Sequence, residues 1–170
     1  MPAFTLPDPA TGALVSADSL AGAPAVVAFV CNHCPFVEHV ARQLSQLDGE
    51  SRRDGWRLLA INSNDPRTYP EDAPDRMPTT ARRWHWTFPY LFDESQDVAR
   101  AYGAACTPDF FLFDARGSLA YRGQLDPSSP RNGLPCDGTS LRSAIALVLA
   151  GQAVPEPHAP SIGCNVKWRP

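Results

Sequence analysis

The chain has 170 residues, of which 44% are hydrophobic and 19% charged, with a net charge of −3. This length suits one well-packed domain and is too short for two ordinary ones. The weakly acidic charge gives no electrostatic basis for binding nucleic acid or an anionic membrane, and no apolar stretch reaches the roughly 20 residues of a bilayer span. The chain also starts without the basic and apolar regions of a signal peptide, so we expect a cytoplasmic protein.

The first predicted elements lead up to a pair of cysteines. A turn-rich segment precedes residues 13–15, a short strand or edge hairpin, and residues 26–30 are continuously apolar, which predicts a buried strand. That strand stops at Cys31, and Cys34 follows two residues after it. Apolar residues then recur at intervals of three and four, which predicts a helix that buries Val37, Val40, Ala41, Leu44 and Leu47.

A strand that delivers two cysteines to the first turn of a helix has a chemical consequence. The free N–H groups and the dipole at a helix N-terminus favour a thiolate, and they lower a cysteine pKa from about 8.5 to between roughly 3.5 and 7.5. Asn32 is the predicted cap of this helix, and Pro35 falls in its first turn, where a missing N–H does no harm. Because thiolates are the nucleophiles of disulfide exchange, Cys31 and Cys34 are predicted to form a redox pair.

A cysteine pair of this spacing also occurs in structural zinc sites and in structural disulfides. Structural zinc needs four ligands, usually from a second closely spaced pair, and Cys106, Cys136 and Cys164 are isolated from one another. A purely structural disulfide is disfavoured by the expected reducing compartment. No metal and no cofactor are therefore predicted, and with five cysteines at least one thiol of a monomer stays unpaired.

The remaining apolar segments predict further strands and helices. Four strands are expected, at residues 56–61, 88–92, 109–113 and 119–123. Three helices are expected, at residues 79–86, 95–102 and 139–150, with Ser95 as the N-cap of the second. The two strands after residue 108 are joined by a tight turn at residues 114–117, which predicts a hairpin.

Proline-rich segments connect these elements. Residues 62–78 predict a long, largely extended excursion, and residues 125–138 predict a second loop. We assign residues 1–154 to the folded domain and residues 155–170 to a proline-rich tail on or near its surface. The run of arginine, tryptophan and histidine at residues 82–86 resembles a nucleic-acid patch, but the overall charge favours a solvated helix face covering a core edge.

The element order describes an α/β protein with a mixed central sheet covered by helices on both faces. With Cys31 and Cys34 at the first strand-to-helix junction, the chain resembles the thioredoxin fold. In that superfamily a cis proline precedes a sheet strand and faces the cysteine pair, and Thr107-Pro108 stands before the strand at residues 109–113. The resemblance therefore implies a cis bond at Pro108, although only about 5 to 6% of X–Pro bonds in folded proteins are cis.

Further segments resemble the redoxin, or peroxiredoxin-like, branch of the superfamily. The matching segments are residues 31–37, 69–72, 88–93, 106–110 and 160–164. Peroxiredoxins carry a proline and a threonine before their reactive cysteine, where this chain has Val27 and Cys31 if Cys34 holds that position. Thioredoxins carry a buried aspartate and a tryptophan before the pair, where this chain has Ala25 and Val30. A proton acceptor must then come from elsewhere, and Glu38 is the nearest acidic residue in sequence.

The resemblance and the motif together predict a thiol–disulfide oxidoreductase with an antioxidant or related redox role. Cys31 is expected to attack a disulfide of a partner protein or small thiol, and Cys34 to resolve the mixed disulfide. His33 is the expected tuner of the Cys31 thiolate, unless it merely faces solvent. Thr107 and Pro108 are expected to border the substrate groove.

Two alternatives remain open, a peroxiredoxin-like thiol peroxidase and a redox-sensing or metal-binding domain without turnover. The other three cysteines differ in where they are expected to lie. Cys106, two residues before Pro108, is expected near the redox pair, either as an auxiliary thiol or buried in an apolar pocket. Cys136 is expected to be an exposed bystander, and Cys164 to reach the pair only if the tail folds back.

Overall fold

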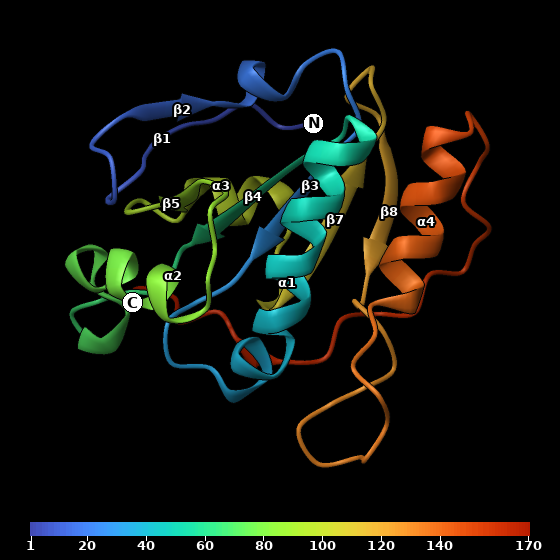
Figure 1. Ribbon diagram of the computed structural model, residues 1–170. Coiled ribbons are helices and arrows are strands. Elements are labelled where there is room, and N and C mark those ends of the chain that lie inside the picture. Colours follow the sequence, from blue (N-terminus) through green and yellow to red (C-terminus); the bar gives the residue numbers. More distant parts are fainter.

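A five-stranded sheet organises the computed structural model, which describes all 170 residues (Figure 1). In sheet order its strands are β5 (Tyr90–Phe92), β4 (Arg57–Asn62), β3 (Ala25–Phe29), β7 (Asp109–Phe113) and β8 (Leu119–Gly123). Strands β3, β4 and β5 run parallel, whereas β7 is antiparallel to β3 and β8 is antiparallel to β7. The predicted mixed sheet of a thioredoxin-like fold is therefore confirmed.

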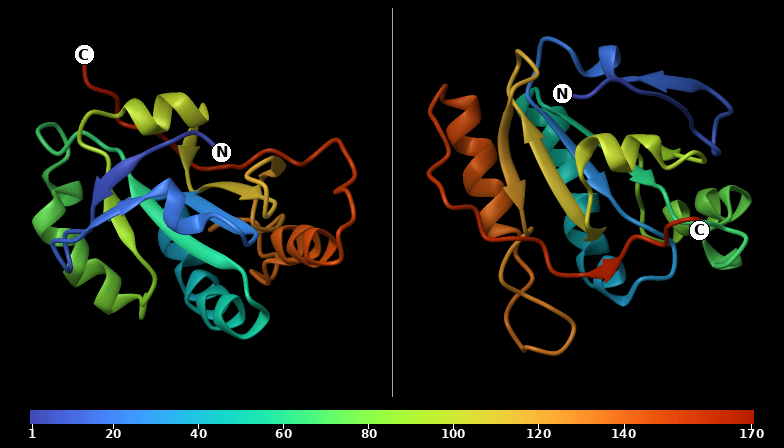
Figure 2. Two further views of the ribbon diagram at one scale, coloured as in Figure 1. Left: turned by 90° about the horizontal axis from the view of Figure 1, so that it is seen from above. Right: turned by 180° about the vertical axis from the view of Figure 1, so that it is seen from behind.

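The alternation of side chains along β3 divides the core in two. Val26 and Ala28 pack on the face covered by helices α1 (Pro35–Asp54) and α4 (Thr139–Leu149). Val27 and Phe29 pack on the opposite face. That face is covered by α3 (Asp97–Tyr102), η1 (Ala17–Leu20) and the hairpin of β1 (Thr5–Pro7) and β2 (Leu14–Ser16) (Figure 2, left).

Helix α1 has defined ends that place the cysteine pair. Pro35 is its first residue, where a proline costs no hydrogen bond, and Gly55 ends it in the left-handed conformation with φ of 79°. The predicted apolar stripe is buried against the sheet. Cys34 is consequently the N-cap residue of a long helix that starts directly below β3 (Figure 1).

The excursion after β4 is more ordered than its prolines suggest. Two short 3-10 helices, η2 (Pro70–Asp72) and η3 (Pro74–Arg76), lead into α2 (Met77–Arg83), so the prediction of an extended segment is wrong. Each of the three begins with a proline at its first or second position, which is compatible with a helical turn. The turns fold the chain back, and Asp72 becomes fully buried.

Two other local predictions need correction. Helix α3 begins at Asp97, and Gln96, with φ of 66°, is its N-cap in place of Ser95. Gln96 is fixed there because its buried amide donates to the carbonyl oxygens of Ser63 and Lys167, at 2.6 and 2.8 Å. Ser95 instead accepts a hydrogen bond from the backbone N–H of Asp97 at 3.2 Å.

The aromatic run after α2 belongs to the core. Trp84 and Trp86 are buried, and the indole N–H of Trp86 donates to the carbonyl oxygen of Ala41 at 2.9 Å. The guanidinium of Arg83 covers Trp84 at 4.9 Å from the ring centroid. These tryptophans cannot stack on nucleic-acid bases, because both rings are already packed within the protein.

The tail folds back along the molecule. Residues 155–170 leave the region of α4 and cross the end of the sheet at which α1 begins (Figure 2, right). There β9 (Cys164–Asn165) pairs antiparallel with β6 (Cys106–Thr107), and Val166 is buried. None of the helices is sufficiently long and apolar to span a bilayer.

Candidate active site

Cys31 and Cys34 flank the junction between β3 and α1. Both are 1% exposed, so the motif is a buried pair covered by other parts of the chain. Cys34 lies at the N-cap of α1, beside the unpaired N–H groups of the first turn. Cys31 lies one turn earlier, where the chain leaves the sheet.

Thr107 touches both sulfurs. Its peptide bond to Pro108 is cis, as the resemblance implies. The Thr107 hydroxyl lies 3.5 Å from the Cys31 sulfur, and its carbonyl oxygen lies 3.2 Å from the Cys34 sulfur and accepts a hydrogen bond from the thiol. Thr107 is buried and pairs with the tail, whereas Pro108 lines a surface pocket with Phe36 and Ile162.

Cys31 has an environment that retains its proton. The pKa of its thiol is raised chiefly by the hydrogen bond to Cys34, then by burial, and then by the negative charge of Asp72. The Thr107 hydroxyl acts in the opposite direction but does not offset these effects.

Cys34 has the opposite environment. The hydrogen bond from Cys31 lowers the pKa of Cys34 to about 4, against the effect of burial. Cys164 contributes through its side chain and its backbone N–H, and Val37 donates its backbone N–H from the first turn of α1. These donors favour negative charge on the Cys34 sulfur, whereas the Thr107 carbonyl oxygen beside it favours the protonated thiol. The sequence-based assignment of the thiolate to Cys31 stays a prediction.

Asp72 is the functional residue that sequence reasoning missed. Its fully buried carboxylate accepts hydrogen bonds from the Asn32 backbone N–H at 2.7 Å and the Asn64 side-chain amide at 2.8 Å. Its carboxylate lies within 4.8 Å of the Cys31 sulfur and is better placed than Glu38 to accept a proton from it, since Glu38 is exposed on α1. The available signal was its presence in residues 69–72, which match the redoxin branch.

His33 and Asn32 both point toward the loop that carries Asp72. The Nδ1 atom of His33 lies 2.7 Å from Oδ2 of Asp72, at an angle that makes it an ion-pair contact and not an aligned hydrogen bond. The ring of His33 stacks on Tyr69, with centroids 5.4 Å apart and planes 6° from parallel. His33 is therefore held against Asp72 and does not simply face solvent.

Asn32 does not cap α1. Its side-chain amide donates to the carbonyl oxygen of Glu71 at 2.9 Å and accepts a hydrogen bond from the Tyr90 hydroxyl at 3.0 Å. These contacts draw the side chain away from the helix N-terminus, where no side-chain cap is formed. Asn32 instead fixes the Asp72 loop beside the cysteines.

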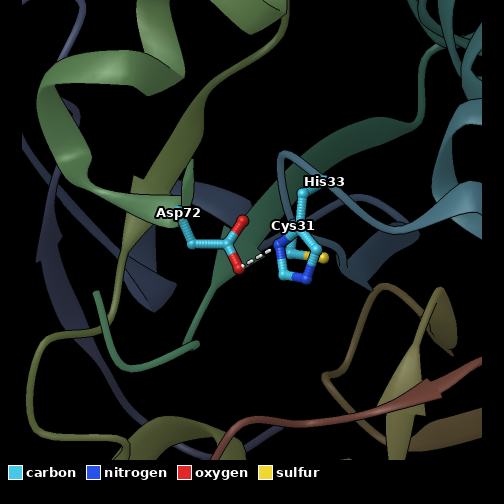
Figure 3. A group of neighbouring side chains, drawn as sticks. All are labelled: Cys31, His33 and Asp72. Atoms are coloured by element: carbon cyan, nitrogen blue, oxygen red, sulfur yellow. Dashed lines mark ion pairs between the residues drawn. The ribbon is translucent and has the colours of Figure 1, made fainter. Parts of the chain in front are cut away.

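One group of side chains in this site has the composition of a metal site. Cys31, His33 and Asp72 each present one donor atom, and these atoms lie within 4.8 Å of one another (Figure 3). Three ligands are one fewer than a closed structural zinc site needs, but catalytic zinc sites use three with an open fourth position. The same three residues could therefore hold a metal ion or handle the proton of Cys31.

The other cysteines differ from one another. The Cys106 thiol donates to the Pro108 carbonyl oxygen at 3.5 Å, and burial raises its pKa to about 12. Cys136 is half-buried, with its sulfur 3.6 Å from the His39 carbonyl oxygen, so its description as exposed is wrong. Cys164 contacts the Cys34 sulfur directly, which makes it the third thiol of the site.

Comparison with known proteins places this geometry in context. Residues 1–122 match the model of the AhpC/TSA family. Thiol-disulfide oxidoreductase ResA of Halalkalibacterium halodurans is 26% identical over 108 residues, which are 64% of this chain and 57% of that protein. The chain thus matches little more than half of that relative's length.

Solved structures resemble the chain over nearly its whole length. An uncharacterized conserved protein from Geobacillus kaustophilus is 48% identical with a TM-score of 0.96, covering 99% of this chain and 90% of that one. A hypothetical protein from Sinorhizobium meliloti is 43% identical with a TM-score of 0.95, covering 99% and 92%. A putative thiol:disulfide interchange protein DsbE from Chlorobium tepidum, 22% identical, covers 87% and 94% with a TM-score of 0.69 and shows the shared fold alone.

Proposed function

The chain belongs to the AhpC/TSA family of the thioredoxin-like superfamily, and we propose that it is a thiol–disulfide oxidoreductase that uses Cys31 and Cys34 as its redox pair. The observation that carries this proposal is the placement of the two sulfurs. Cys34 is the N-cap residue of α1, where the Val37 N–H favours its thiolate, while the Cys31 sulfur lies within 4.8 Å of the Asp72 carboxylate, whose negative charge favours the protonated thiol. A thiolate nucleophile is thus adjacent to a protonated thiol that can resolve the product.

The first step is attack by the Cys34 thiolate on a disulfide of the partner. A bond forms between Cys34 and one partner sulfur, the partner's S–S bond breaks, and the other sulfur leaves as a thiolate. This order reverses the roles expected from the sequence, because the charges around the pair favour the negative sulfur at Cys34.

In the second step Cys31 resolves the mixed disulfide. Its proton passes to the neighbouring Asp72 carboxylate, and the Cys31 thiolate attacks the Cys34 sulfur. The Cys31–Cys34 disulfide forms, and the partner leaves with both of its sulfurs reduced. Two electrons move from the cysteine pair to the partner, and the reverse sequence oxidises a dithiol.

The burial of the two sulfurs limits how a substrate can reach them. Both are 1% exposed, and the edge of Thr107 is occupied by β9, so residues of the tail or His33 must shift before a disulfide can enter. A disulfide of a partner protein or a small thiol fits this proposal, as does a reducing, cytoplasmic setting that returns the pair to its reduced form. The name of the relative ResA agrees with the same chemistry.

A thiol peroxidase is the second candidate, because a cysteine with a lowered pKa at a helix N-terminus also attacks peroxides. Val27 and Cys31 stand where peroxiredoxins carry a proline and a threonine, so the groups that orient a peroxide there are missing. The third candidate is a metal-binding or redox-sensing domain, which the donors of Cys31, His33 and Asp72 favour.

Parallel assays on the same protein separate these functions. We expect reduced protein to reduce insulin or glutathione disulfide with formation of a Cys31–Cys34 bridge, and to consume hydrogen peroxide much more slowly. Faster consumption of peroxide than of disulfide would favour the peroxidase. Metal analysis of protein purified under reducing conditions tests the third candidate. A metal-binding domain should contain one metal ion per chain, and Cys31→Ser should prevent its binding.

A further inference from the structure

The tail lies against the catalytic residues as a paired strand. Cys164 is opposite Thr107 in the ladder between β9 and β6, so the tail pairs with the residue that touches both redox sulfurs. Gly163 makes the approach possible, because a side chain at this position would clash with the Thr107 carbonyl and the Pro108 nitrogen. The position of the tail strand is thus built into its sequence.

Contacts on both sides of β9 hold this strand in place. Before it, the Ser161 hydroxyl donates to the Gly123 carbonyl oxygen at 2.7 Å, and the Gln124 N–H donates to the Ala159 carbonyl oxygen at 3.0 Å. Beyond it, Lys167 continues the attachment. Contacts before and after β9 therefore place Cys164 opposite Thr107.

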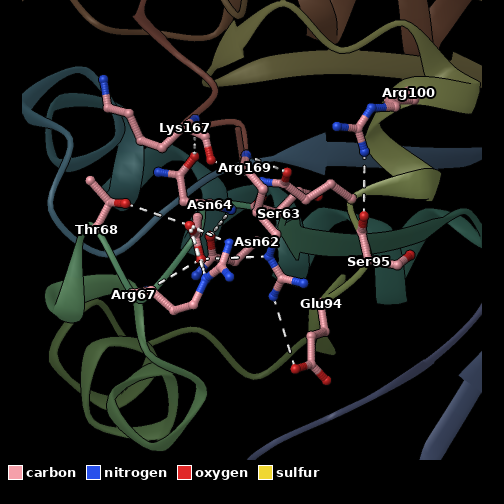
Figure 4. Close-up of polar contacts among 12 residues, drawn as sticks. Asn62, Ser63, Asn64, Arg67, Thr68, Glu94, Ser95, Arg100, Lys167 and Arg169 are labelled. Carbon is pink, nitrogen blue, oxygen red and sulfur yellow. Dashed lines mark hydrogen bonds and ion pairs between the residues drawn. The ribbon is translucent and has the colours of Figure 1, made fainter.

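The anchor beyond β9 is shared with the Asp72 loop. The Lys167 N–H donates to the Asn64 side-chain oxygen at 2.8 Å (Figure 4). The Asn64 amide in turn donates to Asp72 at 2.8 Å. The Lys167 carbonyl oxygen accepts from the Asp65 N–H at 3.0 Å, and Arg169 forms an ion pair with Asp65 at 3.5 Å. The tail and the catalytic loop therefore form one polar network.

Cys164 is directed at the Cys34 sulfur. Its thiol and its backbone N–H both contact that sulfur and favour negative charge there. The pKa of Cys164 is itself raised to about 11, first by burial and then by its contact with Cys34. Cys164 thus places a third thiol beside the proposed nucleophile, opposite Thr107 in the strand pairing.

We propose that Cys164 is a second resolving cysteine, which attacks Cys34 and forms an alternative Cys34–Cys164 disulfide. This inference rests on the proposed function, since the mixed disulfide at Cys34 is its starting point. Cys164 loses its proton to solvent and its sulfur bonds to Cys34, while the bond between Cys34 and the partner breaks and the partner sulfur leaves as a thiolate. The partner disulfide is the oxidant, and Cys31 remains a free thiol.

The two products differ in their structural consequences. A Cys31–Cys34 bridge stays within one turn, whereas a Cys34–Cys164 bridge ties the tail to the start of α1. The oxidised protein then holds β9 covalently on Thr107, the edge at which an extended partner segment would have to pair. The Cys31 thiol can reverse this by attacking Cys34, which releases Cys164 without any external reductant.

The test uses the full chain with Cys31 replaced and glutathione disulfide as the probe. In Cys31→Ser, Cys34 should acquire a glutathione adduct that disappears as a Cys34–Cys164 bridge forms. Peptide mapping under non-reducing conditions measures the adduct and the bridge over time. In Cys31→Ser/Cys164→Ser the same adduct should persist at least about tenfold longer. Cys31→Ser/Cys136→Ser is the matched control and should behave like Cys31→Ser, because Cys136 lies elsewhere.

The outcomes are separable. Equal adduct lifetimes with and without Cys164, in protein that keeps its circular dichroism spectrum, would overturn the role of Cys164 and leave the proposed function intact. If none of these variants acquires an adduct while the wild-type protein does, Cys34 is not the first nucleophile and the role of Cys164 fails with it, whereas a wild-type protein that acquires no adduct overturns the proposed function itself. Diamide oxidation of Cys31→Ser supplies a second measurement, which should give the Cys34–Cys164 bridge without any glutathione.

Discussion

The two sides of the cysteine pair present opposite environments to two identical side chains. On one side, Cys31 faces the buried carboxylate of Asp72, and the pKa of its thiol is raised. On the other, Cys34 faces the N–H groups of Val37 and Cys164, and its pKa is lowered to about 4. Residues three positions apart in one motif therefore have different surroundings, and in the proposed function these surroundings decide which sulfur starts the reaction.

The two sulfurs also differ in how far along the chain the residues around them lie. On the Cys34 side, the first turn of α1 supplies the local donor Val37, and the tail adds Cys164. On the Cys31 side, the local effect is the hydrogen bond to Cys34, and the long-range effect is the charge of Asp72, which comes from the loop after β4 and is held by Asn32 and Asn64. We propose that local structure activates Cys34 and that the distant loop makes Cys31 differ from it.

The largest expected effect comes from removing the proposed nucleophile. Cys34→Ser should slow the first attack on glutathione disulfide by about 10³-fold or more, because no other sulfur has a stabilised thiolate. Cys31→Ser should retain this first step. Stopped-flow measurement of adduct formation in the two variants checks the comparison, and a greater loss in Cys31→Ser would restore the roles expected from the sequence.

Replacing the buried carboxylate tests the other side of the pair. Asp72→Asn should lower the pKa of Cys31, because it removes a negative charge beside that thiol, and slow resolution of the mixed disulfide by about 10²-fold through loss of a proton acceptor. Single-turnover release of the partner thiol measures the rate. A faster release would mean that Asp72 acts only by repulsion.

Asp72→Asn should also destabilise the fold by about 1 to 3 kcal/mol, because charged hydrogen bonds to Asn32 and Asn64 are weakened. Asp93→Asn is a suitable control, as Asp93 is another buried aspartate, which accepts hydrogen bonds from Ser63 and Ala99. Denaturant unfolding should show a loss of stability in both variants. Only Asp72→Asn should change the chemistry of Cys31.

The pH dependence gives a smaller and more gradual effect. Because the pKa of Cys34 is lowered to about 4, its thiolate is lost only as the pH falls through that value. The rate constant of the first attack should be level above about pH 5 and fall about tenfold per unit below the pKa. A rate that rises through the alkaline range would instead identify the high-pKa thiol of Cys31 as the nucleophile.

The smallest expected effect concerns His33. His33→Gln removes an imidazole that contacts Asp72 and stacks on Tyr69, and it should make the pair more reducing by about 30 mV, a tenfold change in equilibrium constant. Equilibration with glutathione measures this potential. His39→Gln is the matched control, since His39 lies on α1 and contacts the Ser128 hydroxyl instead of Asp72. An unchanged potential would remove His33 from redox tuning.

The sequence by itself determined the frame of the site. The uninterrupted apolar run of β3, the stripe of α1 and the position of Pro35 are local patterns, and they placed Cys31 and Cys34 at a strand-to-helix junction. The resemblance added the cis bond at Pro108. Errors fell where local signals compete with distant contacts, as at Ser95, where the neighbouring Gln96 is fixed by Lys167 of the tail.

Only the tertiary structure decided which residues surround each sulfur. Asp72 is 40 residues from Asn32, and Cys164 meets Cys34 because the tail pairs with Thr107. The spacing of apolar residues does not predict such contacts, since a proline-rich loop and a proline-rich tail have no repeating apolar pattern. The distribution of negative charge between the two sulfurs depends on where the folded chain places Asp72 and Cys164. Only the tertiary structure therefore decides it.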